Sequence, residues 1–160
     1  MKDQRMRRVL GRGICLAAVL TLGCVYASAQ NKNSGSHAKT FSVASVEGSY
    51  GITYNGTILN AAGFSGPLAA TGQIVADGKG NLQGSETFNV DGTICEGAIA
   101  GTYTVNADGT GQIRATFTPA TKGCPSGTTS WSVVLVDGGQ EVFLCQTESD
   151  KVLWGEARKQ

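Results

Sequence analysis

The chain has 160 residues, of which 23 are Gly, 3 are Pro and 16% are charged, and its formal net charge is +1. This length predicts one domain. The 41% of hydrophobic residues is enough for a packed core, which excludes wholesale disorder. The small net charge gives no reason to expect a nucleic acid as partner.

The first residues have the three parts of a secretory signal peptide. A basic segment (MKDQRMRR) comes first, an apolar run from Ile14 to Tyr26 follows, and a small-x-small cleavage signal ends at Ala29. The apolar run is too short to span a bilayer, which takes about 20 residues. We therefore expect residues 1–29 to be removed, no transmembrane segment, and a secreted or periplasmic protein.

A lipid anchor is the alternative to this cleavage. Thr21-Leu22-Gly23-Cys24 resembles a bacterial lipobox, in which the cysteine becomes lipid-modified, although Thr21 stands where Leu is usual. The sequence leaves open whether the chain is cleaved after Ala29 or anchored through Cys24.

Removal of the signal peptide changes the charge of the protein. Residues 1–29 hold five of the 13 basic and one of the 12 acidic residues, so the mature chain carries a net charge of about −3. A mildly acidic protein argues further against nucleic acids and anionic membrane surfaces as partners.

Residues 30–46 are polar, small and aperiodic, which predicts a flexible linker. His37, the only histidine of the chain, lies in this segment, where we expect it to be solvated. Without a second His or a cysteine pair at metal-ligand spacing, the sequence supports neither a metal site nor a cofactor.

The rest of the chain, residues 47–160, has the pattern of an all-β domain. Short apolar or alternating runs are separated by glycine turns, and four Asp-Gly pairs favour tight hairpins. Short connections in series predict a single antiparallel up-and-down barrel of about eight strands. Longer connections are expected near 57–67 and 119–129, and the expected strands are 48–56, 68–76, 81–90, 93–105, 110–118, 130–136, 140–147 and 151–158.

One hairpin allows its register to be predicted. If Asp91-Gly92 is a two-residue turn, Phe88 faces Cys95 and Glu86 faces Gly97. One face of the hairpin then carries mainly apolar residues and glycines, and we expect it to point into the barrel: Leu82, Gly84, Phe88, Cys95, Gly97, Ile99, Gly101, Tyr103 and Val105.

Glu86 is the exception on this inward face. A carboxylate in an apolar interior costs free energy unless it is paired, and burial raises its pKa. Inside the barrel, Glu86 could anchor a ligand, act as a general acid or base, or be paired with Tyr103 or the backbone. A register slip of one residue would instead place it outside. Our candidate ligand-lining residues are Glu86, Tyr103, Phe88 and Ile99, and no catalytic residue is assigned.

Aromatic side chains occur almost once per expected strand, as a barrel core requires. We expect the following residues to pack in the interior: Tyr50, Tyr54, Phe88, Tyr103, Phe117, Trp131, Phe143 and Trp154.

Three cysteines, Cys95, Cys124 and Cys145, remain after removal of the signal peptide, in a compartment where disulfides form. Cys95 begins the fourth expected strand and Cys124 follows the fifth, so both lie at the same end of an up-and-down barrel. This placement favours a Cys95–Cys124 disulfide and leaves Cys145 as a free, buried thiol with no assigned role. A catalytic thiol has little support, because no histidine is available as its base.

The chain lacks the motifs of several enzyme classes. It has no G-x-S-x-G, no P-loop, no C-x-x-C and no dinucleotide-binding fingerprint. A Ser-His-Asp triad is nearly excluded, because the single histidine lies in the expected linker.

Glycine and turn motifs at 48–51, 72–74, 77–81, 101–111 and 136–139 resemble those of small secreted bacterial proteins that are similar to the allene oxide cyclase and calycin groups. The resemblance covers about residues 48–158 and implies a calycin-like barrel. Barrels of the allene oxide cyclase group include enzymes that cyclise a hydrophobic substrate, but no catalytic residue of that group matches a position here.

Together these features predict a non-enzymatic, exported β-barrel protein that binds a small apolar ligand or has a structural role in the envelope. One alternative is an allene oxide cyclase-like isomerase or cyclase that holds its substrate in the barrel, with Glu86 or Tyr103 as polar groups. Another is a surface interaction module, which would show an exposed apolar patch or an unpaired edge strand. The oligomeric state is not predicted.

Overall fold

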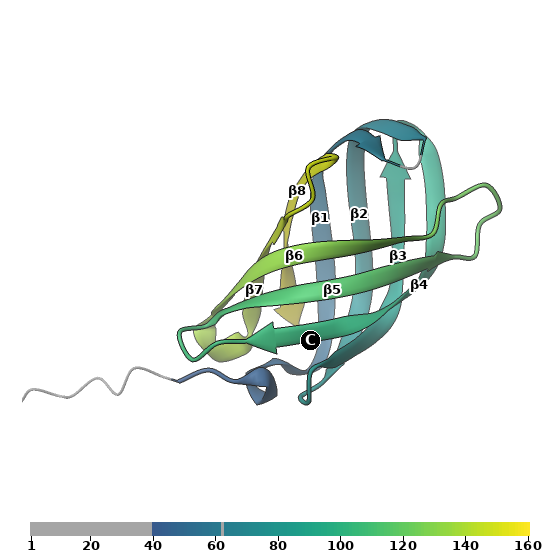
Figure 1. Cartoon of the computed structure of the whole chain (residues 1–160). Helices are drawn as coiled ribbons and strands as arrows, with labels where there is room; N and C mark the ends of the chain where they lie inside the picture. The colour runs from purple at the N-terminus through teal and green to yellow at the C-terminus, as the bar shows by residue number, and fades with distance from the viewer. Residues whose placement is uncertain (1–39, 62) are drawn as a thin grey trace, which may run out of the picture. The chain divides into compact units, whose positions relative to one another are not determined.

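The computed structural model describes residues 40–61 and 63–160, which form a closed barrel of antiparallel strands (Figure 1). The axes of β1–β3 are nearly aligned, with the chain direction alternating from strand to strand, and β5 and β6 cross them at a steep angle. The strands are β1 (Glu47–Ala61), β2 (Phe64–Asp77), β3 (Asn81–Val90), β4 (Thr93–Val105), β5 (Thr110–Pro119), β6 (Gly127–Val136), β7 (Glu141–Gln146) and β8 (Lys151–Lys159).

The strand order confirms the predicted fold class. Each strand pairs with the next one in the chain, and β1 pairs with β8 to close the sheet. A single all-β, antiparallel, up-and-down barrel of eight strands is therefore present. The short 3-10 helix η2 (Asp137–Gly139) forms the β6–β7 connection.

The first hairpin is longer than predicted. Residues 57–67 were expected to form a loop, because glycines and a proline are typical of turns, but β1 and β2 continue through most of this range. Thr57 pairs with Pro67, and Pro67 lies just beyond the last β2–β3 pair, Leu68 with Val90. The missing N–H of the proline therefore interrupts no β2–β3 pairing.

The β3–β4 hairpin has the predicted register. Asp91 and Gly92 form its turn with φ angles of 47° and 88°, the positive values that such a two-residue turn requires. The pairs are those expected from this turn: Phe88 with Cys95, Glu86 with Gly97, and Gly84 with Ile99.

The core lies inside the barrel. Its buried side chains come from all eight strands, and Tyr50, Val90 and Cys95 are the most completely buried large ones. Six of the eight aromatic residues expected in the core point inward, but Phe143 and Trp154 are 48% and 62% exposed.

Both wrong placements come from strands that are apolar on both faces. In β7, Val142 is buried while its neighbour Phe143 is exposed, and in β8 Leu153 is buried while Trp154 is exposed. The expectation that Cys145 is buried is also wrong. Side chains alternate along β7, and Cys145 is exposed on the outer face like Phe143. Cys145 forms no disulfide with another described residue.

Residues 40–46, assigned from the sequence to a flexible linker, cover one end of the barrel. They include the 3-10 helix η1 (Val43–Val46). The Tyr103 hydroxyl donates a hydrogen bond to the carbonyl oxygen of Val43 at 3.1 Å, and Phe41 packs against the core. The apolar residues of this segment explain the difference, because they bury surface that a polar linker would leave solvated.

The remaining predictions for the N-terminus lie outside the described residues. They concern the signal peptide (1–29), lipidation at Cys24, and the part of the linker that contains His37. In the part of the chain that the structure describes, no helix is both long and apolar enough to cross a membrane.

Candidate functional site

Two cavities lie in the part of the barrel interior that the described residues line. The first has a volume of about 80 Å³ and lies toward η1, with Val46 and Tyr103 in its wall. The second has a volume of about 130 Å³ and lies toward the opposite end, where Phe64 and Ser126 line it. Both walls are mainly apolar, as is typical of sites for small molecules.

All four predicted ligand-lining residues lie in the walls of these cavities. Glu86, Ile99 and Tyr103 line the first cavity, and Glu86 and Phe88 line the second. Glu86 therefore points inward, as the hairpin register predicted, and is shared between the two cavities.

Five residues line both cavities, and we call them the waist: Tyr54, Glu86, Phe117, Thr129 and Trp131. At the waist, the Tyr54 hydroxyl donates a hydrogen bond to Oε2 of Glu86 at 2.8 Å. The rings of Tyr54 and Trp131 pack edge to face, with centroids 5.1 Å apart. The waist thus combines one carboxylate, one phenol and an aromatic wall.

Glycines on the neighbouring strands make room for the inward Glu86. It pairs with Gly72 on β2 and Gly97 on β4. A Cβ atom at Gly72 would lie 2.9 Å from the Cβ of Glu86, and one at Gly97 would lie 2.6 Å from the Phe117 ring. Larger residues at these two positions would push Glu86 and Phe117 out of their places in the waist.

Burial sets the protonation chemistry of the Tyr54–Glu86 pair. Loss of solvent raises the pKa of Glu86 above its ordinary value of 4.5, and the hydrogen bond from Tyr54 lowers it only in part. Burial, and then the nearby Glu86 carboxylate, raises the pKa of Tyr54 well above 10.0. Tyr54 therefore stays a neutral donor at physiological pH, while Glu86 holds its proton to higher pH than an exposed glutamate.

We expect the Glu86→Gln variant to be more stable than the wild type at pH 7. Folding raises the pKa of Glu86, so the folded state binds its proton more tightly and the wild type loses stability as the pH rises through that pKa. Glutamine cannot ionise and still accepts the Tyr54 hydrogen bond. Urea unfolding from pH 4 to pH 8 should show the advantage of the variant shrinking as the pH falls.

Glu96→Gln is the matched control for this prediction, because Glu96 is exposed on the neighbouring strand β4. It should change stability little at any pH. An advantage of Glu86→Gln that stays constant from pH 4 to pH 8 would contradict the assignment of the effect to the ionisation of Glu86.

Tyr103 lines the first cavity but is not the hydrogen-bond partner of Glu86, which was one of the alternatives for Glu86. Its hydroxyl bonds to the η1 segment rather than to Glu86, and Tyr54 is the partner of Glu86. Tyr54 was expected to pack in the interior, and it shares the inward face of β1 with Tyr50 and Ile52. Its register relative to Glu86 could not be predicted, because residues 57–67, which join β1 to β2, were taken for a longer connection without pairing.

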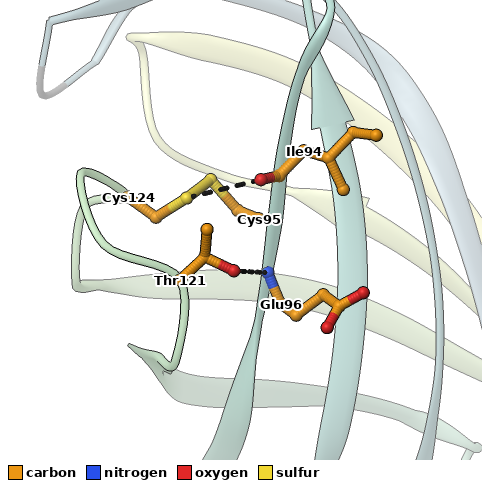
Figure 2. Close-up of a disulfide and its surroundings, with 5 residues drawn as sticks. All are labelled: Ile94, Cys95, Glu96, Thr121 and Cys124. Carbon is orange, nitrogen blue, oxygen red and sulfur yellow. Dashed lines mark hydrogen bonds between the residues drawn. A yellow bond between two sulfur atoms is a disulfide. The ribbon is translucent and has the colours of Figure 1, made fainter.

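A disulfide ties the β5–β6 loop to the start of β4 (Figure 2). Cys95 and Cys124 form the predicted bond, with Cα atoms 5.8 Å apart. The backbone N–H of Glu96 donates a hydrogen bond to the Thr121 hydroxyl at 3.1 Å, beside the disulfide. Residues 125–127, which follow Cys124, line the second cavity, so the disulfide also positions part of its wall.

The outer surface carries exposed apolar residues, which is one of the two features expected of an interaction module. Four large apolar side chains on the neighbouring strands β6–β8 are between 45% and 62% exposed: Val134, Phe143, Val152 and Trp154. The second feature, an unpaired edge strand, is missing among the described strands, because each one has two neighbours in the closed sheet.

Within residues 40–61 and 63–160, no three His, Cys, Asp or Glu side chains come together in a way that could hold a metal ion. No protein-family model matches the chain, and no curated protein or solved structure is similar enough to count as a match. The resemblance to the allene oxide cyclase and calycin groups therefore stays a prediction, and a functional proposal has to rest on the geometry of the barrel.

Proposed function

We propose that the protein is an exported, non-enzymatic β-barrel that binds a small apolar ligand in its interior. The observation that carries this proposal is the pair of apolar cavities that meet at the waist around Glu86. A purely structural barrel would gain stability by filling this space with side chains, because a cavity makes the folded state less stable.

The volumes of the cavities limit the size of the ligand. An apolar protein cavity of about 150 Å³ is known to bind benzene. The second cavity, at about 130 Å³, is close to this size, and the first, at about 80 Å³, adjoins it at the waist. A compact ligand of about one aromatic ring therefore matches these cavities in size.

Export is supported by two independent features. The N-terminal sequence has the parts of a signal peptide, and the disulfide between Cys95 and Cys124 is a bond typical of oxidising compartments.

We expect the ¹⁵N-labelled protein to bind toluene, seen in NMR spectra as shifts of amides in the strands that form the waist. The Ala61→Leu variant should weaken binding by about tenfold or more, because Ala61 lines the second cavity and three added carbons occupy part of it. Ala69→Leu is the matched control, because Ala69 is exposed on the outer face of β2.

Absence of binding, or equal binding by wild type and Ala61→Leu, would contradict the proposal. Absence of binding would favour the structural envelope role, in which the barrel needs no ligand. Equal binding would show that toluene does not occupy the second cavity.

An isomerase or cyclase that uses the same cavity is the second candidate. Glu86 favours it, because it points inward, has a raised pKa and is hydrogen-bonded to a buried phenol, which are properties of a general acid or base. In such an enzyme Glu86→Gln would bind the substrate but not convert it, whereas in a binding protein there is no turnover to lose.

A further inference from the structure

We propose that the waist selects a ligand with a hydrogen-bond donor as its polar group, an amine or a hydroxyl on a compact apolar body, which binds to the free side of the Glu86 carboxylate. This inference rests on the proposed function and names the chemical class of its ligand.

The carboxylate of Glu86 has one oxygen available for a ligand. Its Oε2 accepts the hydrogen bond from Tyr54, and its Oε1 forms no hydrogen bond with another described residue. Because Glu86 lines both cavities, a ligand in either one can place a polar group beside this oxygen. An ionised carboxylate accepts hydrogen bonds and donates none, so the complementary group is a donor.

The charge of the cavity walls favours an amine over a carboxylic acid. Among residues 40–61 and 63–160, no Lys, Arg or His lines the first cavity. Lys151 is the one cationic residue of the described chain that lines the second cavity, and its ammonium group lies 3.4 Å from Asp150 and 3.9 Å from Glu148. The charge of Lys151 is thus already matched, and a carboxylate ligand would meet Glu86 without a free cation to offset the repulsion.

The present partner of Glu86 compensates its charge incompletely. A buried carboxylate costs free energy unless it is paired and hydrogen-bonded. Tyr54 supplies one neutral donor. A ligand ammonium group would supply both further donors and the opposite charge, so it should gain more from Glu86 than a hydroxyl, and a hydroxyl more than a methyl group.

Four probes of nearly equal shape separate these contributions: toluene, benzyl alcohol, benzylamine and benzoate. The chain has two tryptophans, Trp131 in the waist and Trp154 on the outer face. In a Trp154→Phe background, tryptophan emission therefore reports on the waist alone. We expect affinity at pH 7.5 to fall in the order benzylamine, benzyl alcohol, toluene, benzoate.

Glu86→Gln should weaken benzylamine binding by about tenfold or more and change toluene binding by less than about twofold. Glu96→Gln, on the outer face, is the matched control and should leave all four affinities unchanged. If Glu86→Gln does not fold, the ¹³C shift of the Glu86 carboxyl carbon in the wild type provides the same information, because it should move with benzylamine and not with toluene.

The outcomes distinguish this inference from the proposed function. If none of the four probes binds, the proposed function fails. If toluene binds but benzylamine binds no more tightly, or if benzoate binds best, the barrel is a binding protein and the selection of a donor by Glu86 is overturned.

Discussion

The Gly84→Ala variant is expected to lose about 3 kcal/mol of its free energy of unfolding. Gly84 lies between Ile74 on β2 and Ile99 on β4. A Cβ atom there would overlap the carbonyl oxygen of Gln73 and lie 2.8 Å from the Cα of Ile74. These atoms belong to backbone held by sheet hydrogen bonds, so they cannot move without disturbing the β2–β3 pairing. Urea unfolding followed by circular dichroism measures the loss.

Gly127→Ala is the matched control for this variant. Gly127 begins β6 and is exposed, and a Cβ atom added to it would have no neighbour within 4 Å. Its substitution should change the free energy of unfolding by less than about 0.5 kcal/mol. Equal effects of the two substitutions would show that the cost comes from the general loss of glycine rather than from the close approach of β2 and β3.

Removal of the disulfide in the double variant Cys95→Ser/Cys124→Ser should cost about 3–4 kcal/mol of stability. The two cysteines are 29 residues apart in the sequence, and their bond restricts the unfolded chain over that loop. Cys95 is also completely buried, so a serine there adds an unpaired hydroxyl to the core. Urea unfolding of the oxidised wild type and of the double variant measures the difference.

Cys145→Ser is the control for this experiment, because Cys145 is exposed and forms no disulfide with a described residue. It should unfold like the wild type. A double variant as stable as the wild type would mean that the β5–β6 loop is held by other contacts, such as the hydrogen bond between Glu96 and Thr121.

Local turn chemistry made part of this site predictable. The Asp91-Gly92 turn determines the register of β3 against β4, and that register alone places Glu86 inside the barrel opposite Gly97. The Cys95–Cys124 disulfide was predictable for a related reason, since in an up-and-down order the start of β4 and the end of β5 lie at the same end.

Features that depend on pairing across longer connections were not predictable. The β1–β2 and β2–β3 registers together place Tyr54 beside Glu86. The β1–β2 register was not predictable, because the hairpin contains glycines and a proline that are typical of loops. The outward placement of Phe143 and Trp154 was hidden because both faces of β7 and β8 carry apolar residues, so alternation gives no sign of which face is buried.

Closure of the sheet by β1 and β8 has a consequence for the order of folding. All other pairings join strands that are consecutive in the chain, whereas this one joins residues such as Ile52 and Ala157, about a hundred positions apart. The entropy of closing so long a loop has to be overcome before these contacts form. The hairpins can therefore assemble first and the β1–β8 pairing last. A chain in which β8 is not yet in place would leave the backbone groups of β1 and β7 unpaired, and these two edges are where another chain could pair with it.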